Sequence, residues 1–451
     1  MGRLPKRSST TVTWILILVI VASAAIAAPQ PIRNIPASDS LSAKDRLKVF
    51  EDVWQTIDEK YYDPRFNGVN WKAVRERYRP LVEQVAGDDH FYGLLKRMVG
   101  ELRDAHTRFH TPRERRERKH QETITAGLSI FEVEGRSVVV NVDPKSEAQR
   151  LGVEPGMIVR SIDGNPISDW IAANRPLVLG SSSERAARLR LYRRIIDGEP
   201  GTSFKLGLTR ADGTLLEVTL IRRTVSETPA ADWRRLPAGF GYIRLNVWKS
   251  PIHREFKRAL DRLKDTPGLI IDLRGNPGGE VSEVLQIAEH FFSSRVSFGR
   301  FISRSGKSVQ LFTGDEDEDD VYSGPVAILV NESSGSGSEM FTGVLQESGR
   351  AVVIGRQSCG CLLGIAKFRE VEGGGELAVS ELAYASPKGR RLEGTGVIPD
   401  AQVALTIADL QRHRDAALEA AEQALRAPLK TSTGVRWRVP EFQVLLSTPA
   451  R

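Results

Sequence analysis

The segment Asn331–Glu339 limits the fold more than any other part of the sequence, because small, hydroxyl-bearing residues join a buried-strand pattern to an amphipathic helix pattern. Upstream, Pro325–Val330 is a short apolar run of strand character, and the apolar residues within Met340–Leu345 fall at helical spacing. Ser336 is therefore expected at or beside a helix N-terminus, where free N–H groups and the helix dipole stabilise an oxyanion. We interpret it as a candidate nucleophile; the alternative is a Gly/Ser turn capped by Ser338.

The length, composition and charge favour a folded protein of several domains. A chain of 451 residues is too long for one core, and 40% hydrophobic with 27% charged residues is an ordinary globular composition. Three basic leader residues leave a mature net charge of +4 (7 − 3), which argues against a nucleic-acid partner. The basic cluster Arg113–Lys119 contains acidic residues, and the acidic run Asp315–Asp320 lacks the pattern of a calcium loop. We expect both to be solvated, and we expect no metal or cofactor.

The N-terminus has the pattern of an export signal. Basic residues precede the apolar run Trp14–Val21, and Ala25 and Ala27 occupy the small-residue positions for cleavage after Ala27. The apolar run is short for a membrane-spanning helix. We predict a signal peptide over residues 1–27 and a periplasmic or otherwise exported protein, with an uncleaved membrane anchor as the alternative.

The hydrophobic pattern changes along the rest of the chain. Residues 42–121 show helical spacing, and residues 122–225 show short strands around a small helix, which predicts a compact barrel. Over 230–410, strands alternate with helices, as in a wound α/β core. Residues 411–451 contain a final helix and a polar tail. The expected fold class is therefore multidomain α+β.

Five parts of the chain match one family in the same order. They are the helical region, the barrel-like module, the segment Ile270–Gly279, the serine segment and Leu392–Asp400. Over roughly residues 45–410 the chain resembles the C-terminal processing peptidases, also called tail-specific proteases. The resemblance implies a PDZ-like barrel and a ClpP/crotonase-like α/β core, and polypeptides or their C-terminal tails as substrates.

The resemblance also implies a site. It makes Ser336 the nucleophile and places backbone oxyanion donors near Gly278 and Gly337. The commonest family members activate the serine with a lysine 25 residues downstream, where this chain has Cys361. A thiol is a poor substitute for an unprotonated amine. Cys359 and Cys361 are the only cysteines in the sequence. A disulfide between them would close a small ring and add little stability to the fold. Otherwise we expect Cys361 to be a small apolar residue near the site, with redox control as the alternative.

A second branch, which resembles the tricorn core, uses serine, histidine and glutamate. Its histidine segment matches Asp104–Thr107, which gives His106, and its glutamate matches Glu393. A neutral imidazole can take the serine proton, and a carboxylate can orient the imidazole. We therefore predict a triad of Ser336, His106 and Glu393. The alternatives are two other carboxylates, Glu376 and Glu381, and two displaced lysine bases, Lys367 and Lys388. We expect His110 and His120 to face solvent.

The PDZ-like module is expected to hold a peptide. Such a module needs a loop whose amides grip a chain terminus, and a peptide would then add as a strand beside that loop. The predicted binding residues are Ala126, Gly127, Leu128, Ser129 and Ile130. The alternative is a barrel that only braces or gates the active site. The expected function is an exported serine endopeptidase of unfolded or tail-exposed proteins; because the usual lysine is missing, the alternative is a peptide-binding pseudoenzyme.

Overall fold

The computed structural model describes residues 41–120, 122–178, 180–226, 228–314 and 321–426, together with the backbone of 428–431 and 434–437. The expected signal peptide, residues 1–27, lies outside the described residues, and so do the acidic run 315–320 and most of the expected tail. Among the described helices, none is both long enough and apolar enough to cross a membrane.

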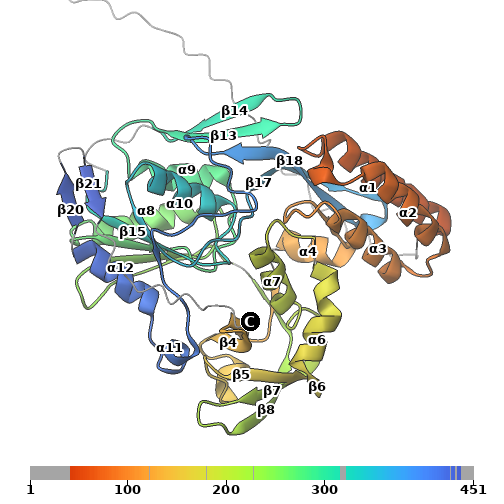
Figure 1. The fold of residues 1–451 in the computed structure, drawn as a ribbon, viewed down its shortest axis with the longest axis horizontal. Coiled ribbons are helices and arrows are strands. Elements are labelled where there is room, and N and C mark those ends of the chain that lie inside the picture. The colour runs from red at the N-terminus through yellow and green to blue at the C-terminus, as the bar shows by residue number, and fades with distance from the viewer. Residues whose placement is uncertain are drawn as a thin grey trace, which may run out of the picture. The chain divides into compact units, whose positions relative to one another are not determined.

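A layer of helices follows residue 41 and confirms the helical region expected from the sequence (Figure 1). Ser42 and Asn70 cap two of the helices by accepting the amides of Asp45 and Ala73. The helices bury an aromatic-rich core, which also contains Leu377 and neighbouring residues from a distant strand. The elements are α1 (Ala43–Lys60), η1 (Phe66–Gly68), α2 (Trp71–Gln84), α3 (Asp88–Gly100) and α4 (Pro112–His120).

The middle module, residues 122–226, is a small antiparallel sheet with short helices. Its strand order is β3-β4-β5-β7-β8, so β3 is an edge strand of this sheet. Helix α7 packs beside β3, with an ion pair between Arg188 and Glu132. The elements are β2 (Glu122–Thr125), β3 (Leu128–Val133), β4 (Arg136–Val142), α5 (Glu147–Arg150), β5 (Ile158–Ile162), β6 (Asn165–Pro166), α6 (Ile167–Asn174), η2 (Arg175–Val178), α7 (Glu184–Arg193), β7 (Ser203–Thr209), β8 (Leu215–Ile221) and β9 (Arg223–Ser226).

The core is a six-stranded sheet in the order β10-β11-β12-β15-β16-β19. All neighbouring pairs are parallel except β10 with β11. Both faces are covered, as a parallel sheet requires. The elements are β10 (Ala231–Arg235), β11 (Gly241–Leu245), α8 (Ile252–Leu263), β12 (Leu269–Asp272), α9 (Val281–Glu289), β15 (Val326–Val330), α10 (Gly337–Glu347), β16 (Val352–Gly355), β19 (Ala401–Gln402), α11 (Ile407–Gln411) and α12 (Ala416–Arg426).

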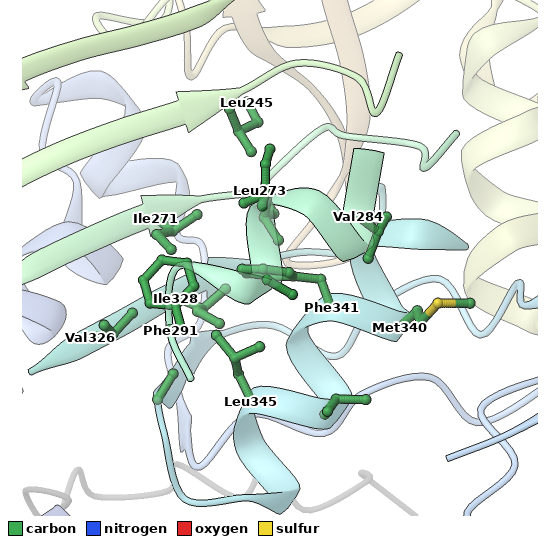
Figure 2. Close-up of a cluster of buried hydrophobic side chains, with 14 of the residues drawn as sticks. Leu245, Ile271, Leu273, Val284, Phe291, Val326, Ile328, Met340, Phe341 and Leu345 are labelled. Carbon is green, nitrogen blue, oxygen red and sulfur yellow. The ribbon is translucent and has the colours of Figure 1, made fainter. Parts of the chain in front are cut away.

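Alternate residues of the core strands bury against different helices. Ile271 and Ile328 pack with α8, α9 and α10, whereas Ile270 and Ala327 pack on the side of α12. Figure 2 shows the first of these clusters, in which Phe341 of α10 lies among strand side chains. The strand β15 and the helix α10 are thus both fixed by the core, and so is the serine segment between them.

A further sheet ties the helical layer to the core. Strand β1 (Arg108–His110) pairs antiparallel with β18 (Glu376–Ala385), with Phe109 opposite Leu377. β18 also pairs with β17 (Leu363–Glu370) and β13 (Ser297–Ser303), and β13 pairs with β14 (Ser308–Phe312). The short helix η4 (Glu372–Gly374) joins β17 to β18. Where the sequence suggested a polar tail, β20 (Pro428–Thr431) and β21 (Gly434–Trp437) pair as antiparallel strands.

We expect the Phe341→Ala substitution to destabilise the core by about 3–5 kcal/mol, because it removes a fully buried ring beneath the serine segment. Urea denaturation, monitored by tryptophan fluorescence, measures the change. The matched control is Leu215→Ala, whose side chain is 70% exposed and whose loss should change stability by less than about 0.5 kcal/mol. Equal effects of the two substitutions would contradict this description of the core.

Candidate active site

Ser336 lies where the prediction placed it, at the junction of β15 and α10. It is the N-cap of α10, and its backbone has φ +50° and ψ −113°. A non-glycine residue with positive φ is uncommon, and such strained residues cluster at functional sites. Ser336 is half-buried, whereas Ser334 and Ser338 on either side are fully buried and donate their hydroxyls to the carbonyls of Leu273 and Asn276. Ser336 is therefore the serine whose local structure suits a reactive hydroxyl.

The glycine turn after β12 lies directly against Ser336. A Cβ atom added at Gly278 would be 2.6 Å from the Ser336 Cβ and 2.9 Å from the Gly337 amide nitrogen. The Gly278 amide already donates to Asn276 Oδ1 at 2.9 Å. Among the described residues, the amides of Gly337 and Gly279 donate no hydrogen bond, and a Cβ at Gly337 would lie 3.5 Å from the Gly279 nitrogen. Two amides without a hydrogen bond therefore lie on the glycine-turn side of the serine.

Glu339 organises the backbone on the other side of the serine. It is 1% exposed, and its Oε2 accepts the amides of Ser336 at 3.0 Å and Cys361 at 2.9 Å. Its Oε1 accepts the Gly360 amide at 2.7 Å and the Ser358 hydroxyl at 2.6 Å. Burial raises the pKa of Glu339, and these hydrogen bonds oppose that rise. The prediction missed this residue, although the S-x-x-E spacing of a capping box would have indicated it.

The two cysteines form a disulfide beside the nucleophile. Cys359 and Cys361 are bonded, with their Cα atoms 5.2 Å apart. The Cys361 carbonyl accepts the Ser336 amide at 2.9 Å, and the Cys359 amide donates to the Ser334 carbonyl at 2.9 Å. Cys361 is therefore one end of a covalent bridge, not a free thiol.

The residues next to His106 in the sequence, Asp104 and Ala105, hold the histidine turn near the disulfide. The Asp104 Oδ1 atom accepts the amides of His106 at 2.7 Å and Thr107 at 2.5 Å, and it also accepts the Ser380 hydroxyl at 3.0 Å. Ala105 packs in one buried cluster with both cysteines and Ala186. The histidine turn is thus fastened to β18 and adjoins the disulfide, which in turn adjoins Ser336.

Burial determines the charge of the His106 ring. Burial is the main cause that lowers the pKa of His106 to about 4; Asp104 opposes the fall, and Arg108 contributes to it. The ring is therefore neutral at pH 7. Its Nδ1 atom and the Asp104 Oδ2 atom are buried without a hydrogen-bond partner. Within the described chain, the ring makes no hydrogen bond to Ser336 or to Glu393.

Glu393 lies next to the disulfide segment. Its Oε2 atom accepts the Leu362 amide at 2.7 Å. The pKa of Glu393 is raised to about 8, mainly by burial and also by the charges of Asp104 and Glu339, while hydrogen bonds from Ser182 and the Leu362 amide oppose the rise. Its carboxyl group is therefore mostly protonated at pH 7.

Three of the four alternative residues have other partners, and the fourth, Lys367, is exposed. Glu376 accepts two bonds from Arg118, Glu381 pairs with Arg369, Lys367 is exposed on β17, and Lys388 donates to the Glu347 carbonyl. His120 is exposed as expected, but the expectation that His110 faces solvent is wrong. His110 is half-buried beside the Phe368 ring, and burial lowers its pKa.

The predicted peptide-binding loop is only partly open. The side chains of Ala126, Leu128 and Ile130 are buried within the middle module, while Ser129 is exposed. The Gly127 amide donates to Thr125 Oγ1 at 3.0 Å, so that amide is occupied. The edge of β3 is the part of this segment that a further strand can reach.

Helix α7 of the middle module also contacts the site. Ser182, just before α7, accepts the Ala105 amide at 2.7 Å, and Ser183 donates to the Cys359 carbonyl. Arg185 donates to the carbonyls of Ser358 at 2.8 Å and Thr395 at 2.7 Å. These bonds connect the middle module with both the histidine turn and the disulfide segment, as the bracing alternative requires.

Two family models match this chain. Residues 239–403 match peptidase family S41, and residues 42–100 match the tricorn protease C1 domain. A carboxyl-terminal-processing protease of Synechocystis sp. is 28% identical over 389 residues, which cover 81% of this chain and 82% of that protein. The chloroplastic carboxyl-terminal-processing peptidase 3 of Arabidopsis thaliana is 26% identical over 388 residues, which cover 81% and 70%.

Solved structures share the fold. The photosystem II D1 C-terminal processing protease superposes with a TM-score of 0.56 at 23% identity, covering 85% of this chain and 97% of that one. The tricorn protease superposes with a TM-score of 0.50 at 20% identity, covering 85% and 37%. The expected combination of a helical N-terminal region with an α/β peptidase core is therefore confirmed.

We expect Gly278→Ala to lower the rate at which a fluorophosphonate labels Ser336 by about 100-fold, because the added Cβ must displace the serine. Gly213→Ala is the matched control: Gly213 also has a left-handed φ, of +85°, but nothing lies within 4 Å of the added carbon. Both variants place alanine at a positive φ, so equal labelling rates would show that the close approach to Ser336 is unimportant.

Proposed function

From its place among the serine-type peptidases of family S41, we propose that this chain is an exported endopeptidase that cuts unfolded or tail-exposed polypeptides with Ser336 as nucleophile. The observation that carries the proposal is the strained Ser336 backbone at the start of α10, with free amides on one side. Relatives named as carboxyl-terminal-processing proteases support polypeptide substrates. The leader pattern over residues 1–27 supports export.

The Gly337 and Gly279 amides are the proposed oxyanion donors. When the Ser336 Oγ attacks a peptide carbonyl, negative charge develops on the carbonyl oxygen, and pre-oriented N–H groups stabilise it. The sequence pointed to Gly278 and Gly337. Since the Gly278 amide is held by Asn276, Gly279 takes its place in the proposal, and Gly278 serves by leaving room for the serine.

His106 is the proposed general base. Its ring is neutral across the physiological range, so a lone pair is available to accept the Ser336 proton. The ring nitrogen that accepted this proton then donates it to the leaving amine. The described residues show no hydrogen bond between the ring and Ser336. The proposal therefore requires that substrate binding bring the imidazole and the serine hydroxyl within hydrogen-bond reach.

Glu393 is the proposed carboxylate that supports the imidazolium. It lies beside Leu362, and Asp104 is near both Glu393 and His106. A protonated carboxyl group cannot stabilise a cation as an anion can, so the support becomes available only as Glu393 ionises.

We expect Ser336→Ala and His106→Ala each to abolish casein cleavage by purified mature protein, with losses of at least about 1000-fold in kcat. Ser333→Ala and His110→Ala are matched controls on the same two segments and should retain cleavage. The readout is the release of peptide fragments. Unchanged cleavage by Ser336→Ala would exclude the nucleophile, and absence of both cleavage and fluorophosphonate labelling in the unaltered protein would favour the peptide-binding pseudoenzyme.

We expect kcat/KM to rise with pH through about 8, because the pKa of Glu393 is raised to that value and only its ionised form supports His106. The histidine, with a pKa of about 4, stays neutral throughout this rise. The Glu393→Gln variant should be less active and should lose the rise, while Glu381→Gln, which removes a distant ion-paired carboxylate, should keep it. A pH profile of Glu393→Gln that matches the unaltered protein would remove Glu393 from the triad.

A further inference from the structure

We propose that the disulfide between Cys359 and Cys361 is the positioning device of this active site: it holds the loop that aligns Ser336 with the segment of Glu393. The proposal rests on the proposed peptidase function and goes beyond it, because it makes the activity depend on the oxidation state of one bond. The bond includes Cys361, which lies 25 residues after Ser336 (361 − 336).

Both ends of the bridged loop Cys359–Cys361 are hydrogen-bonded to the segment that carries the nucleophile. The Cys359 amide donates to the Ser334 carbonyl, and the Cys361 carbonyl accepts the Ser336 amide, each at 2.9 Å. A Cβ added at Gly335 would be 3.5 Å from the Cys359 Cβ and 3.8 Å from its sulfur. The disulfide therefore packs directly against the residue that precedes the nucleophile.

The same loop is bonded to the Glu393 segment. The Gly360 carbonyl accepts the Gly394 amide at 2.9 Å, and the Leu362 amide donates to Glu393 Oε2 at 2.7 Å. Gly360 has φ +73°, and a Cβ there would be 2.9 Å from the Gly394 carbonyl carbon. Only glycine fits between the two cysteines, so the bridged tripeptide is shaped to this contact.

The histidine turn rests on the disulfide as well. Ala105, adjacent to His106, shares a small buried cluster with the two cysteines and Ala186. Cys359 is 9% exposed and Cys361 is 6% exposed, so the bond is covered mainly by this turn and by α7. All three members of the proposed triad thus have a neighbouring residue in contact with one short bridged loop.

A dithiol reductant can break the bond. One reagent thiolate attacks a cysteine sulfur and the other cysteine leaves as a thiolate; the second reagent thiol then closes a cyclic disulfide and frees the first cysteine. Two electrons and two protons pass to the protein. The two thiols no longer share a bond and must move apart, which loosens the loop between Ser336 and Glu393.

The test uses the full mature chain, oxidised or reduced with dithiothreitol. Since the chain has only two cysteines, the reductant acts on this bond alone, and thiol titration verifies complete reduction. We expect kcat on casein to fall about 10- to 100-fold with little change in KM, because the reacting groups are misaligned while substrate contacts elsewhere remain. Reoxidation should restore the rate. The double variant Cys359→Ser, Cys361→Ser should match the reduced protein and ignore the reductant.

Hydrogen exchange supplies a readout that does not need catalysis. In the oxidised protein the amides of Gly360, Cys361 and Ser336 are hydrogen-bonded, so they should exchange slowly and become faster after reduction, while β16 stays unchanged as the internal control. Unchanged kcat and unchanged exchange after complete reduction would overturn the proposal. If the oxidised protein does not cleave casein at all, the proposed function fails, and the exchange result still decides whether the disulfide holds the loop.

Discussion

The pairing of β1 with β18 is the interaction on which the arrangement of the site depends. Without it, the histidine turn would belong to a helical layer and the serine to a separate α/β core. The register places Arg108 opposite Ala378, and Ser380 then bonds both Asp104 and Thr107. β18 also pairs with β17, which begins directly after Leu362. One strand therefore links the histidine turn with the loop beside the nucleophile.

The sequence predicted the local elements well because they depend on nearby residues. The strand before Ser336 and the helix after it follow from apolar spacing, and small residues between them allow only a tight turn. The order of motifs indicated the peptidase family, which the comparisons confirmed. It also selected His106 and Glu393, whose catalytic roles stay predictions.

What the sequence did not predict depends on contacts between distant segments. The sheet formed by β1, β18, β17, β13 and β14 joins residues more than 250 positions apart, and no periodicity in one segment specifies a partner in another. The occupied Gly278 amide depends on one side chain, that of Asn276. The role of Glu339 depends on both kinds of contact. Its capping spacing is local and could have been recognised, but its bonds to the cysteine loop join distant segments.

Burial sets the electrostatics of the site in a way that residue types alone do not suggest. A histidine and a glutamate would ordinarily be expected to form a charged pair near neutral pH. Here the same low-dielectric surroundings lower the pKa of His106 and raise the pKa of Glu393, so that both are uncharged at pH 7. The resting site thus avoids the cost of two buried charges, and charge appears only when the reaction or a higher pH creates it.

The close approach of Gly278 to Ser336 has a consequence for how this sequence can change over time. Many active-site positions tolerate a related residue with partial function, since an acid can replace an acid. At Gly278 the space is already filled by the nucleophile, and its φ of +106° suits no other residue. Gly278 has no side chain and takes no part in the chemistry, yet it should tolerate substitution poorly. We expect a homologue that has lost this glycine to lose the reactivity of the serine before it loses the fold.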